Sequence, residues 1–158
     1  MRLNFSNWSE LKKYYPRISF GKSLLKKVIL SNFKDSDIAD VNIIFVSINE
    51  ITKLNFEFRK KNEPTDVLTF TIEQNPLVGE IYICPEYISK KYGEKEILRN
   101  IVHGLLHLCG YEHKRYFIDG AKQKEKIFVK QENILDNIQY EINNRIGKSR
   151  KKISRNKT

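Results

Sequence analysis

All three histidines of this chain lie in one short stretch, His103-Gly104-Leu105-Leu106-His107-Leu108-Cys109-Gly110-Tyr111-Glu112-His113. The first two are four residues apart, about one helical turn, so on a helix they face the same way. A continued helix would carry His113 about 15 Å onward and onto another face, so the chain must bend back for it to join them. Gly110 stands where a left-handed helix end would make that bend. We therefore predict a metal site of His103, His107 and His113 with one coordination position open, as in catalytic zinc sites.

The residues before this stretch predict the helix that carries it, from Glu94 to Cys109. Apolar residues at helical spacing form a buried seam of Ile97, Ile101, Leu105 and Leu108. A second stripe is polar throughout and comprises Glu96, Asn100, His103 and His107. Asn100 and Glu96 are candidate partners of a liganding histidine, with solvent-exposed surface as the alternative for Glu96. Cys109 is expected to point away from His107 and into the core.

The rest of the chain alternates between strand-like and helix-like segments. Strands are expected at residues 2–5, 41–46, 65–72 and 78–84, the last two antiparallel because their connection is short. Helices are expected at 22–32, after the capping box that begins at Ser47, at 86–92 and at 121–146. This order predicts a single α+β domain, in which helices pack on a small mixed β-sheet around a central metal-binding helix. We place the domain at residues 1–146, followed by a basic tail at 147–158 without a fixed fold.

The net charge of +10, from 29 basic and 19 acidic residues, makes a nucleic acid a plausible partner. Six of these positive charges lie in the tail, which contains no acidic residue. Tail cations can bind phosphates without sequence preference, although a merely solubilising tail is the alternative. The candidate RNA-binding residues of the tail are Lys148, Arg150, Lys151 and Lys152.

The sequence also suggests where the protein works. No apolar run approaches the roughly 20 residues of a membrane span, and the N-terminus lacks the apolar core of a secretion signal. The two cysteines form no disulfide pattern. We expect a cytoplasmic protein without a membrane partner.

The histidine spacing matches the ligands of the extended zinc-protease pattern, but that pattern needs a glutamate after the first histidine as general base. Here that position is Gly104, which argues against peptide hydrolysis. A metal-bound water can instead attack a phosphodiester, because the cation lowers the pKa of that water toward about 7. The charge that develops on the phosphate calls for a cation beside the metal, a task that suits arginine.

Three blocks of this sequence resemble the YbeY family of bacterial endoribonucleases, the rRNA maturation factors. The first is the histidine stretch, and the second runs from Leu54-Asn55 through Phe58-Arg59 to Pro64-Thr65-Asp66-Val67-Leu68-Thr69-Phe70. The third is Val78-Gly79-Glu80-Ile81, similar to the family's Gly-Asp-Ile strand. The resemblance runs in register from about residue 40 to 135. Phe58 stands where the family usually has tyrosine.

The resemblance implies a single-domain α+β metalloprotein that holds one zinc ion on the three histidines. It implies cleavage of single-stranded RNA, maturation of the 16S rRNA 3′ end and ribosome quality control. The family's functional arginine falls on Arg59, which would bind and stabilise the scissile phosphate. The implied partners are rRNA and the small ribosomal subunit, with a small-subunit ribosomal protein and a ribosome-assembly GTPase as further candidates.

Two other functions stay open on the sequence. One is a non-catalytic ribosome-assembly factor whose zinc is structural, although such sites usually have four protein ligands. The other is a metalloprotease or another hydrolase. The metal is also open, because nickel, cobalt or iron bind similar ligands.

Overall fold

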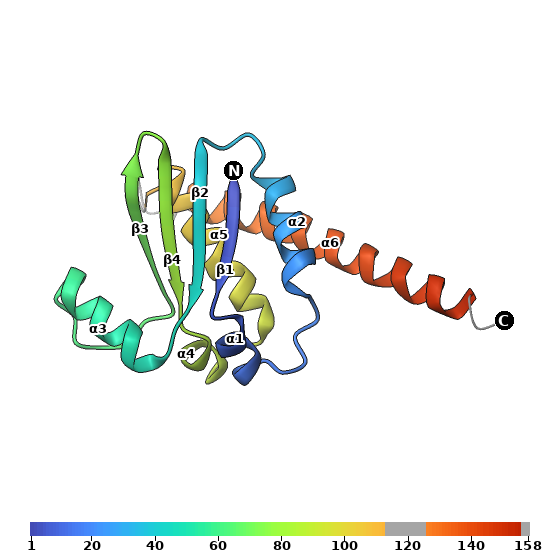
Figure 1. The fold of residues 1–158 in the computed structure, drawn as a ribbon, viewed down its shortest axis with the longest axis horizontal. Coiled ribbons are helices and arrows are strands. Elements are labelled where there is room, and N and C mark those ends of the chain that lie inside the picture. Colours follow the sequence, from blue (N-terminus) through green and yellow to red (C-terminus); the bar gives the residue numbers. More distant parts are fainter. Residues whose placement is uncertain (113–125, 156–158) are drawn as a thin grey trace, which may run out of the picture.

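The structure is a computed structural model that describes residues 1–112 and 126–155, with side chains described as far as residue 147 (Figure 1). The strands of the described residues are β1 (Arg2–Ser6), β2 (Ile38–Phe45), β3 (Val67–Gln74) and β4 (Leu77–Ile83). They form one sheet in the order β1-β2-β4-β3, in which only the β3–β4 pair is antiparallel. The predicted mixed sheet and the antiparallel pair are therefore confirmed.

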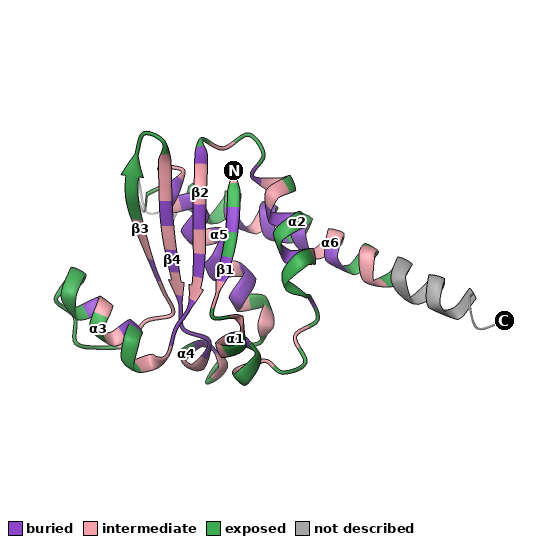
Figure 2. Cartoon of the chain, viewed as in Figure 1, coloured by how far each residue is buried: buried purple, intermediate pink, exposed green. Residues whose placement is uncertain are grey.

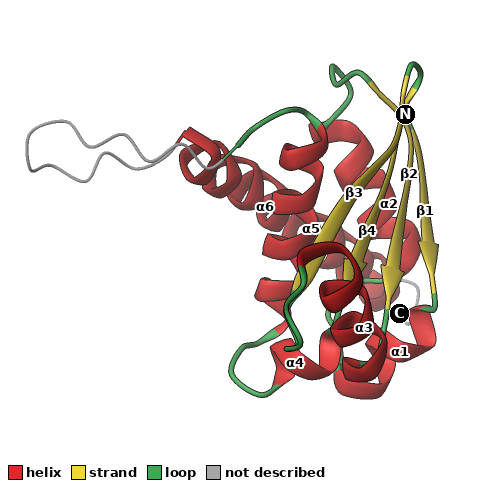
Figure 3. Ribbon diagram, turned by 90° about the vertical axis from the view of Figure 1, so that its left-hand side faces the viewer, coloured by secondary structure: helices red, strands yellow, loops and turns green. Residues whose placement is uncertain are grey.

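The helices of the described residues are α1 (Trp8–Tyr14), α2 (Lys22–Asn32), α3 (Ile48–Arg59), α4 (Pro85–Ser89), α5 (Glu94–Leu108) and α6 (Lys126–Arg155). α5 and α6 lie on one side of the sheet, and α2 packs against both β1 and α6 (Figure 3). α3 begins with the predicted capping box, in which the Ser47 and Glu50 side chains each accept from the other's backbone N–H. The single α+β domain with a central helix is confirmed.

The sheet has two unequal faces. Residues at alternate positions of β2, such as Val41, Ile43 and Phe45, are buried in the large core under α5 and α6 (Figure 2). The opposite face carries a smaller apolar cluster, in which Ile51 of α3 packs with Leu68 of β3. α3 covers only part of this second face, so many of its residues are half-exposed (Figure 2). β3 lies at an edge of the sheet and borders the helices of both faces.

α6 corrects one prediction. It continues through Gly147 to Arg155, so the expected helix end at residue 146 is wrong, and residues 147–155 of the tail are helical (Figure 1). A glycine ends a helix when it takes a left-handed conformation, and Gly147 does not. Inside a helix it only weakens the helix by about 1 kcal/mol relative to alanine. No helix of the described residues, this long one included, is long and apolar enough to cross a membrane.

Candidate functional site

α5 brings His103 and His107 together as the spacing predicts. Their Nε2 atoms are 3.0 Å apart, and their rings are perpendicular with centroids separated by 4.5 Å. Both side chains are half-buried, and the Phe128 ring of α6 stacks on His103 at 6.1 Å. The last two turns of α5 therefore present two imidazole nitrogens to one point in space.

This pair fits a shared metal ion. A tetrahedral zinc ion with bonds of about 2.0–2.1 Å holds two ligand nitrogens about 3.3–3.4 Å apart, so a small opening of the pair accommodates it. The third predicted ligand, His113, lies outside the described residues. Within the described residues, no group of three or more His, Cys, Asp and Glu side chains is placed to hold a metal. Of the three predicted ligands, the structure therefore describes two, His103 and His107, whose imidazole rings converge.

The chain turns directly after these two residues. Gly110 has a φ of 82°, its N–H donates to His107 O at 2.9 Å, and the Tyr111 N–H donates to Leu106 O at 3.0 Å. These two bonds form a Schellman motif, which requires a left-handed residue at the position of the glycine. The predicted glycine turn is confirmed, and it directs the chain away from the axis of α5 before His113.

Gln131 of α6 orients His103, and the sequence analysis missed it. Its Nε2 donates to Glu132 Oε1 at 3.1 Å, which turns its Oε1 toward His103 Nδ1 at 2.8 Å. A carboxylate only accepts hydrogen bonds, so Glu132 fixes the orientation of the amide, and His103 Nδ1 must be the donor to it. The lone pair of His103 is then on Nε2, which faces His107. This is the tautomer that a metal ligand at Nε2 needs.

Arg99 anchors the far end of this network. It binds Glu132 with two nitrogens, at 3.1 and 3.3 Å, and Glu96 with a third at 3.1 Å. Burial raises the pKa of the Glu96 carboxyl, against the opposite effect of the Arg99 guanidinium. Asn100, the other candidate partner from the polar stripe, donates to the Glu96 backbone oxygen at 3.0 Å. Among the described residues, the side chain that orients His103 is therefore Gln131 rather than Asn100 or Glu96. Gln131 lies 28 positions from His103 in the sequence.

Replacing Gln131 by alanine should weaken zinc binding by about 10- to 100-fold, the usual effect of removing an outer partner of a liganding histidine. Gln131→Glu keeps the acceptor but replaces the donor to Glu132 by a second carboxylate oxygen, so it should recover only part of the affinity. Gln139→Ala is the matched control, because Gln139 lies on the same helix and binds Asn143 on the surface. Competition titrations against a chelating dye measure the three affinities. Equal affinities for Gln131→Ala and Gln139→Ala would show that Gln131 does not orient a ligand.

Close packing of α5 on the sheet depends on Gly104. A Cβ atom at this position would lie 2.8 Å from Ile81 Cγ2 and 2.9 Å from Thr69 Oγ1, both in the sheet. Gly79 of β4 makes the reciprocal approach, because a Cβ there would lie 2.5 Å from the Leu108 methyl groups. The position that carries the glutamate base in zinc proteases therefore has no room for a side chain.

A groove of about 700 Å³ joins the histidines to Arg59. It runs beside edge strand β3 and is lined by Phe58, Arg59, Thr65, Asp66, Val67, Leu68, Thr69, Phe70, Thr71, His103 and His107. Arg59 is the last residue of α3 and is exposed, and Lys60 after it takes a left-handed conformation that ends the helix. The Asn55 side chain holds the loop that follows, donating to Glu63 O at 2.8 Å. The predicted arginine thus shares one groove with two of the predicted ligands.

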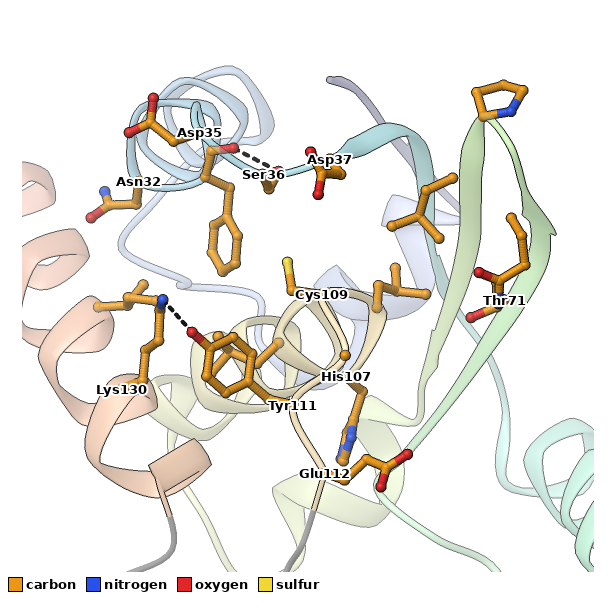
Figure 4. A pocket seen from close by; sticks show the side chains of 18 of the residues that line it. Asn32, Asp35, Ser36, Asp37, Thr71, His107, Cys109, Tyr111, Glu112 and Lys130 are labelled. Atoms are coloured by element: carbon orange, nitrogen blue, oxygen red, sulfur yellow. Dashed lines mark hydrogen bonds between the residues drawn. The ribbon is translucent and has the colours of Figure 1, made fainter.

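A second hollow, of about 1010 Å³, lies on the other side of His107 (Figure 4). Its wall carries Asp35, Asp37 and Glu112, whose charges oppose an RNA backbone. In this wall Lys130 Nζ donates to the Tyr111 hydroxyl at 2.6 Å (Figure 4). The groove beside Arg59 has one acidic lining residue, Asp66, and is therefore the less acidic of the two.

The sequence analysis also made predictions for Cys109 and for four residues of the tail. Cys109 is partly buried against the large core, as expected, and burial raises the pKa of its thiol. The side chains of the four tail residues, Lys148, Arg150, Lys151 and Lys152, lie outside the described part, and their contact with RNA stays a prediction.

Comparison with known proteins identifies the family of this chain. The family model described as Endoribonuclease YbeY matches residues 15–139. A protein of Thermotoga petrophila named Endoribonuclease YbeY is 39% identical over 75% of this chain and 83% of its own length. One of the same name from Endomicrobium trichonymphae is 31% identical over 89% and 95% of the two chains. A solution structure from Thermotoga maritima matches with a TM-score of 0.58 and 32% identity, over 90% of this chain and 93% of its own.

The family match covers the groove residues, the central helix α5 and α6 as far as residue 139. The relatives cover most of both chains, so the similarity is not confined to the histidine motif. The sheet order, the histidine pair and this similarity agree: the chain belongs to the YbeY endoribonuclease family.

Proposed function

We propose that this protein is a metal-dependent endoribonuclease that cleaves single-stranded RNA in the maturation of the 16S rRNA 3′ end and in ribosome quality control. The observation that carries the proposal is the groove that contains Arg59, His103 and His107 together. A nuclease needs a phosphate-binding cation and a source of activated water on the same strand of substrate, and this groove has residues suited to both.

His103, His107 and His113 are the proposed ligands of one zinc ion per chain. When bound, zinc supplies a Lewis acid and lowers the pKa of water at its open position. His103 receives its orientation from Gln131, so the chain prepares one ligand nitrogen before the metal binds. Gly104 removes the carboxylate that peptide hydrolysis would use, which supports a phosphodiester substrate over a peptide.

Arg59 is the proposed phosphate-binding residue. Its guanidinium remains charged at every physiological pH and offers a planar set of donors that match two phosphate oxygens. The preceding helix end and the loop held by Asn55 fix the backbone around Arg59, so its exposed side chain extends from a defined position at the groove, which supports this role. Its role is to bind the scissile phosphate and stabilise the charge that develops there.

The proposed partners are rRNA and the small ribosomal subunit. The net charge of +10 favours association with a polyanion, and α6 carries the basic tail sequence away from the sheet (Figure 1). A small-subunit ribosomal protein and a ribosome-assembly GTPase are further proposed partners of this complex.

Arg59→Ala should lower cleavage of a labelled single-stranded RNA by about 10²- to 10³-fold, the effect of removing one preorganised donor for developing charge. Arg59→Lys should restore part of this loss, since lysine keeps the charge but not the bidentate geometry. Lys53→Ala removes an exposed cation from the same helix away from the groove, and controls for net charge. Initial rates over a range of RNA concentrations separate kcat from KM. Similar rates for Arg59→Ala and Lys53→Ala would contradict the proposed role.

A further inference from the structure

Two phenylalanines, the exposed Phe58 and the partly buried Phe70, form an aromatic pair on the wall of the groove. The rings of Phe58 in α3 and Phe70 in β3 are 4.7 Å apart at 52°, and Phe70 contacts the Tyr82 ring edge-on at 5.7 Å. Phe58 is 57% exposed, whereas burying a phenylalanine contributes roughly 1.5–3 kcal/mol to folding. Contact with Phe70 therefore accounts for only part of this ring, and more than half of the residue stays open to a ligand.

Phe58 is also adjacent in sequence to Arg59, and both line the same groove. A nucleotide has two features that such a pair recognises, a phosphate for the guanidinium and a flat base for the ring. Bases in a duplex are already stacked on their neighbours, so an exposed ring can take only a base from an unpaired strand. Aromatic stacking of this kind is tolerant of sequence, because every base has a π-face.

The charge around the pair favours RNA over an apolar protein partner. Arg59, Lys60 and Lys61 are three consecutive exposed cations at the end of α3. The groove has one acidic residue, Asp66, whose Oδ1 accepts from the Val67 N–H and the Thr65 hydroxyl at 3.0 and 3.1 Å, so a single carboxylate stands against three cations. Aromatic rings beside a row of cations are the combination that single-stranded nucleic acid binds.

We propose that Phe58, supported by Phe70, is a stacking platform for an unpaired base of the RNA strand whose phosphate lies at Arg59. This inference rests on the proposed function and deepens it, because it makes the platform a reason for preferring single strands. Phe58 is a substrate-binding residue in this scheme, and Phe70 positions its ring.

α3 offers a matched control. Phe56 is 55% exposed and lies two residues earlier, about 200° around the helix axis, outside the groove. Phe56→Ala and Phe58→Ala thus remove the same side chain, at nearly the same exposure, from the same helix. Phe58→Tyr keeps a ring of the same shape.

The experiment compares two probes, a labelled single-stranded RNA of about ten nucleotides and an abasic sugar–phosphate strand of the same length. Fluorescence anisotropy at fixed salt gives the affinity of the full-length protein and of the three variants, with strand integrity checked on a gel and folding by circular dichroism. Phe58→Ala should bind the RNA about tenfold more weakly or worse, since one stacked base contributes roughly 5- to 150-fold. Phe58→Tyr and Phe56→Ala should stay within twofold of wild type, and the abasic strand should bind wild type and Phe58→Ala equally.

Two results would overturn the platform. One is an unchanged RNA affinity of Phe58→Ala, and the other is an equal loss on the abasic strand, which would mean that Phe58 only shapes the surroundings of Arg59. Cleavage by the wild-type protein is scored separately. If the wild-type protein cleaves RNA but Phe58→Ala binds it with unchanged affinity, only the stacking platform is rejected. If Phe58→Ala weakens binding of RNA but not of the abasic strand, and no cleavage is seen, the proposed nuclease is rejected and the platform is retained.

Discussion

His107→Ala is expected to lose the metal and at least about 10²-fold of RNA cleavage, while keeping its fold. His107 supplies one of the two described ligand nitrogens, and its Nε2 lies 3.0 Å from that of His103. A mononuclear site that loses one of three protein ligands no longer holds the ion at ordinary concentrations, so the activated water is lost with it. The side chain is half-buried at the last turn of α5 and lies outside the large apolar core, so its removal leaves the packing of that helix intact.

Elemental analysis of the purified protein measures the metal, with circular dichroism for the fold and single-stranded RNA for activity. Wild type should contain about one metal ion per chain and His107→Ala almost none. Lys95→Ala, an exposed change in the first turn of the same helix, should behave as wild type. Unfolding of His107→Ala together with metal loss would favour a structural zinc and the assembly-factor function. Metal and activity that survive in His107→Ala would reject the site.

Gly104→Glu is expected to lower the free energy of unfolding by more than about 4 kcal/mol, a large part of the 5–15 kcal/mol of a typical domain. The new side chain would begin 2.8 Å from Ile81 and 2.9 Å from Thr69, between α5 and the sheet. Overpacking alone costs about 1–3 kcal/mol, and an unpaired carboxylate buried there adds several more. The variant carries the zinc-protease sequence pattern, yet it should not hydrolyse peptides, because the close packing of α5 on the sheet that holds the histidines in place should be lost.

Gly93→Glu controls for this change. It places the same residue at the N-cap of the same helix, where an added Cβ atom would meet nothing within 4 Å and the helix dipole favours a negative charge. Chemical unfolding followed by circular dichroism compares the two variants. A Gly104→Glu protein as stable as Gly93→Glu would show that α5 is free to move away from the sheet.

Local sequence signals predicted the elements that they specify. The capping box at Ser47 gave the start of α3, and Gly110 gave the turn after α5. α1 was not predicted, because it has seven residues and its N-cap, Asn7, makes no side-chain capping bond. β2 starts at Ile38 rather than at residue 41, because its first residues pair with β4 and Asp40 forms an ion pair with Arg2 at 2.9 Å. Such pairing depends on residues far along the chain, and no local pattern shows it.

The residues of the candidate site likewise divide into those that local spacing predicts and those that depend on long-range packing. The positions of His103 and His107 follow from one helical turn, so spacing alone predicted their proximity. Arg59 beside them depends on the packing of α3 and β3, and only the family resemblance indicated it. Gln131 had no signal in the sequence, because it meets His103 through the packing of α6 on α5. Its hydrogen bond required the structure.

The unbroken course of α6 sets a distance within the molecule. Gln131 lies beside His103, and at 1.5 Å per residue the basic segment from residue 148 to residue 155 lies about 26 to 36 Å farther along the same axis. A ligand that contacts both His103 and the basic segment must span that length, so the length of α6 sets the minimum size of such a ligand. A short oligonucleotide that fills the groove leaves the far end unengaged, whereas the folded RNA of a ribosomal subunit is large enough to reach both.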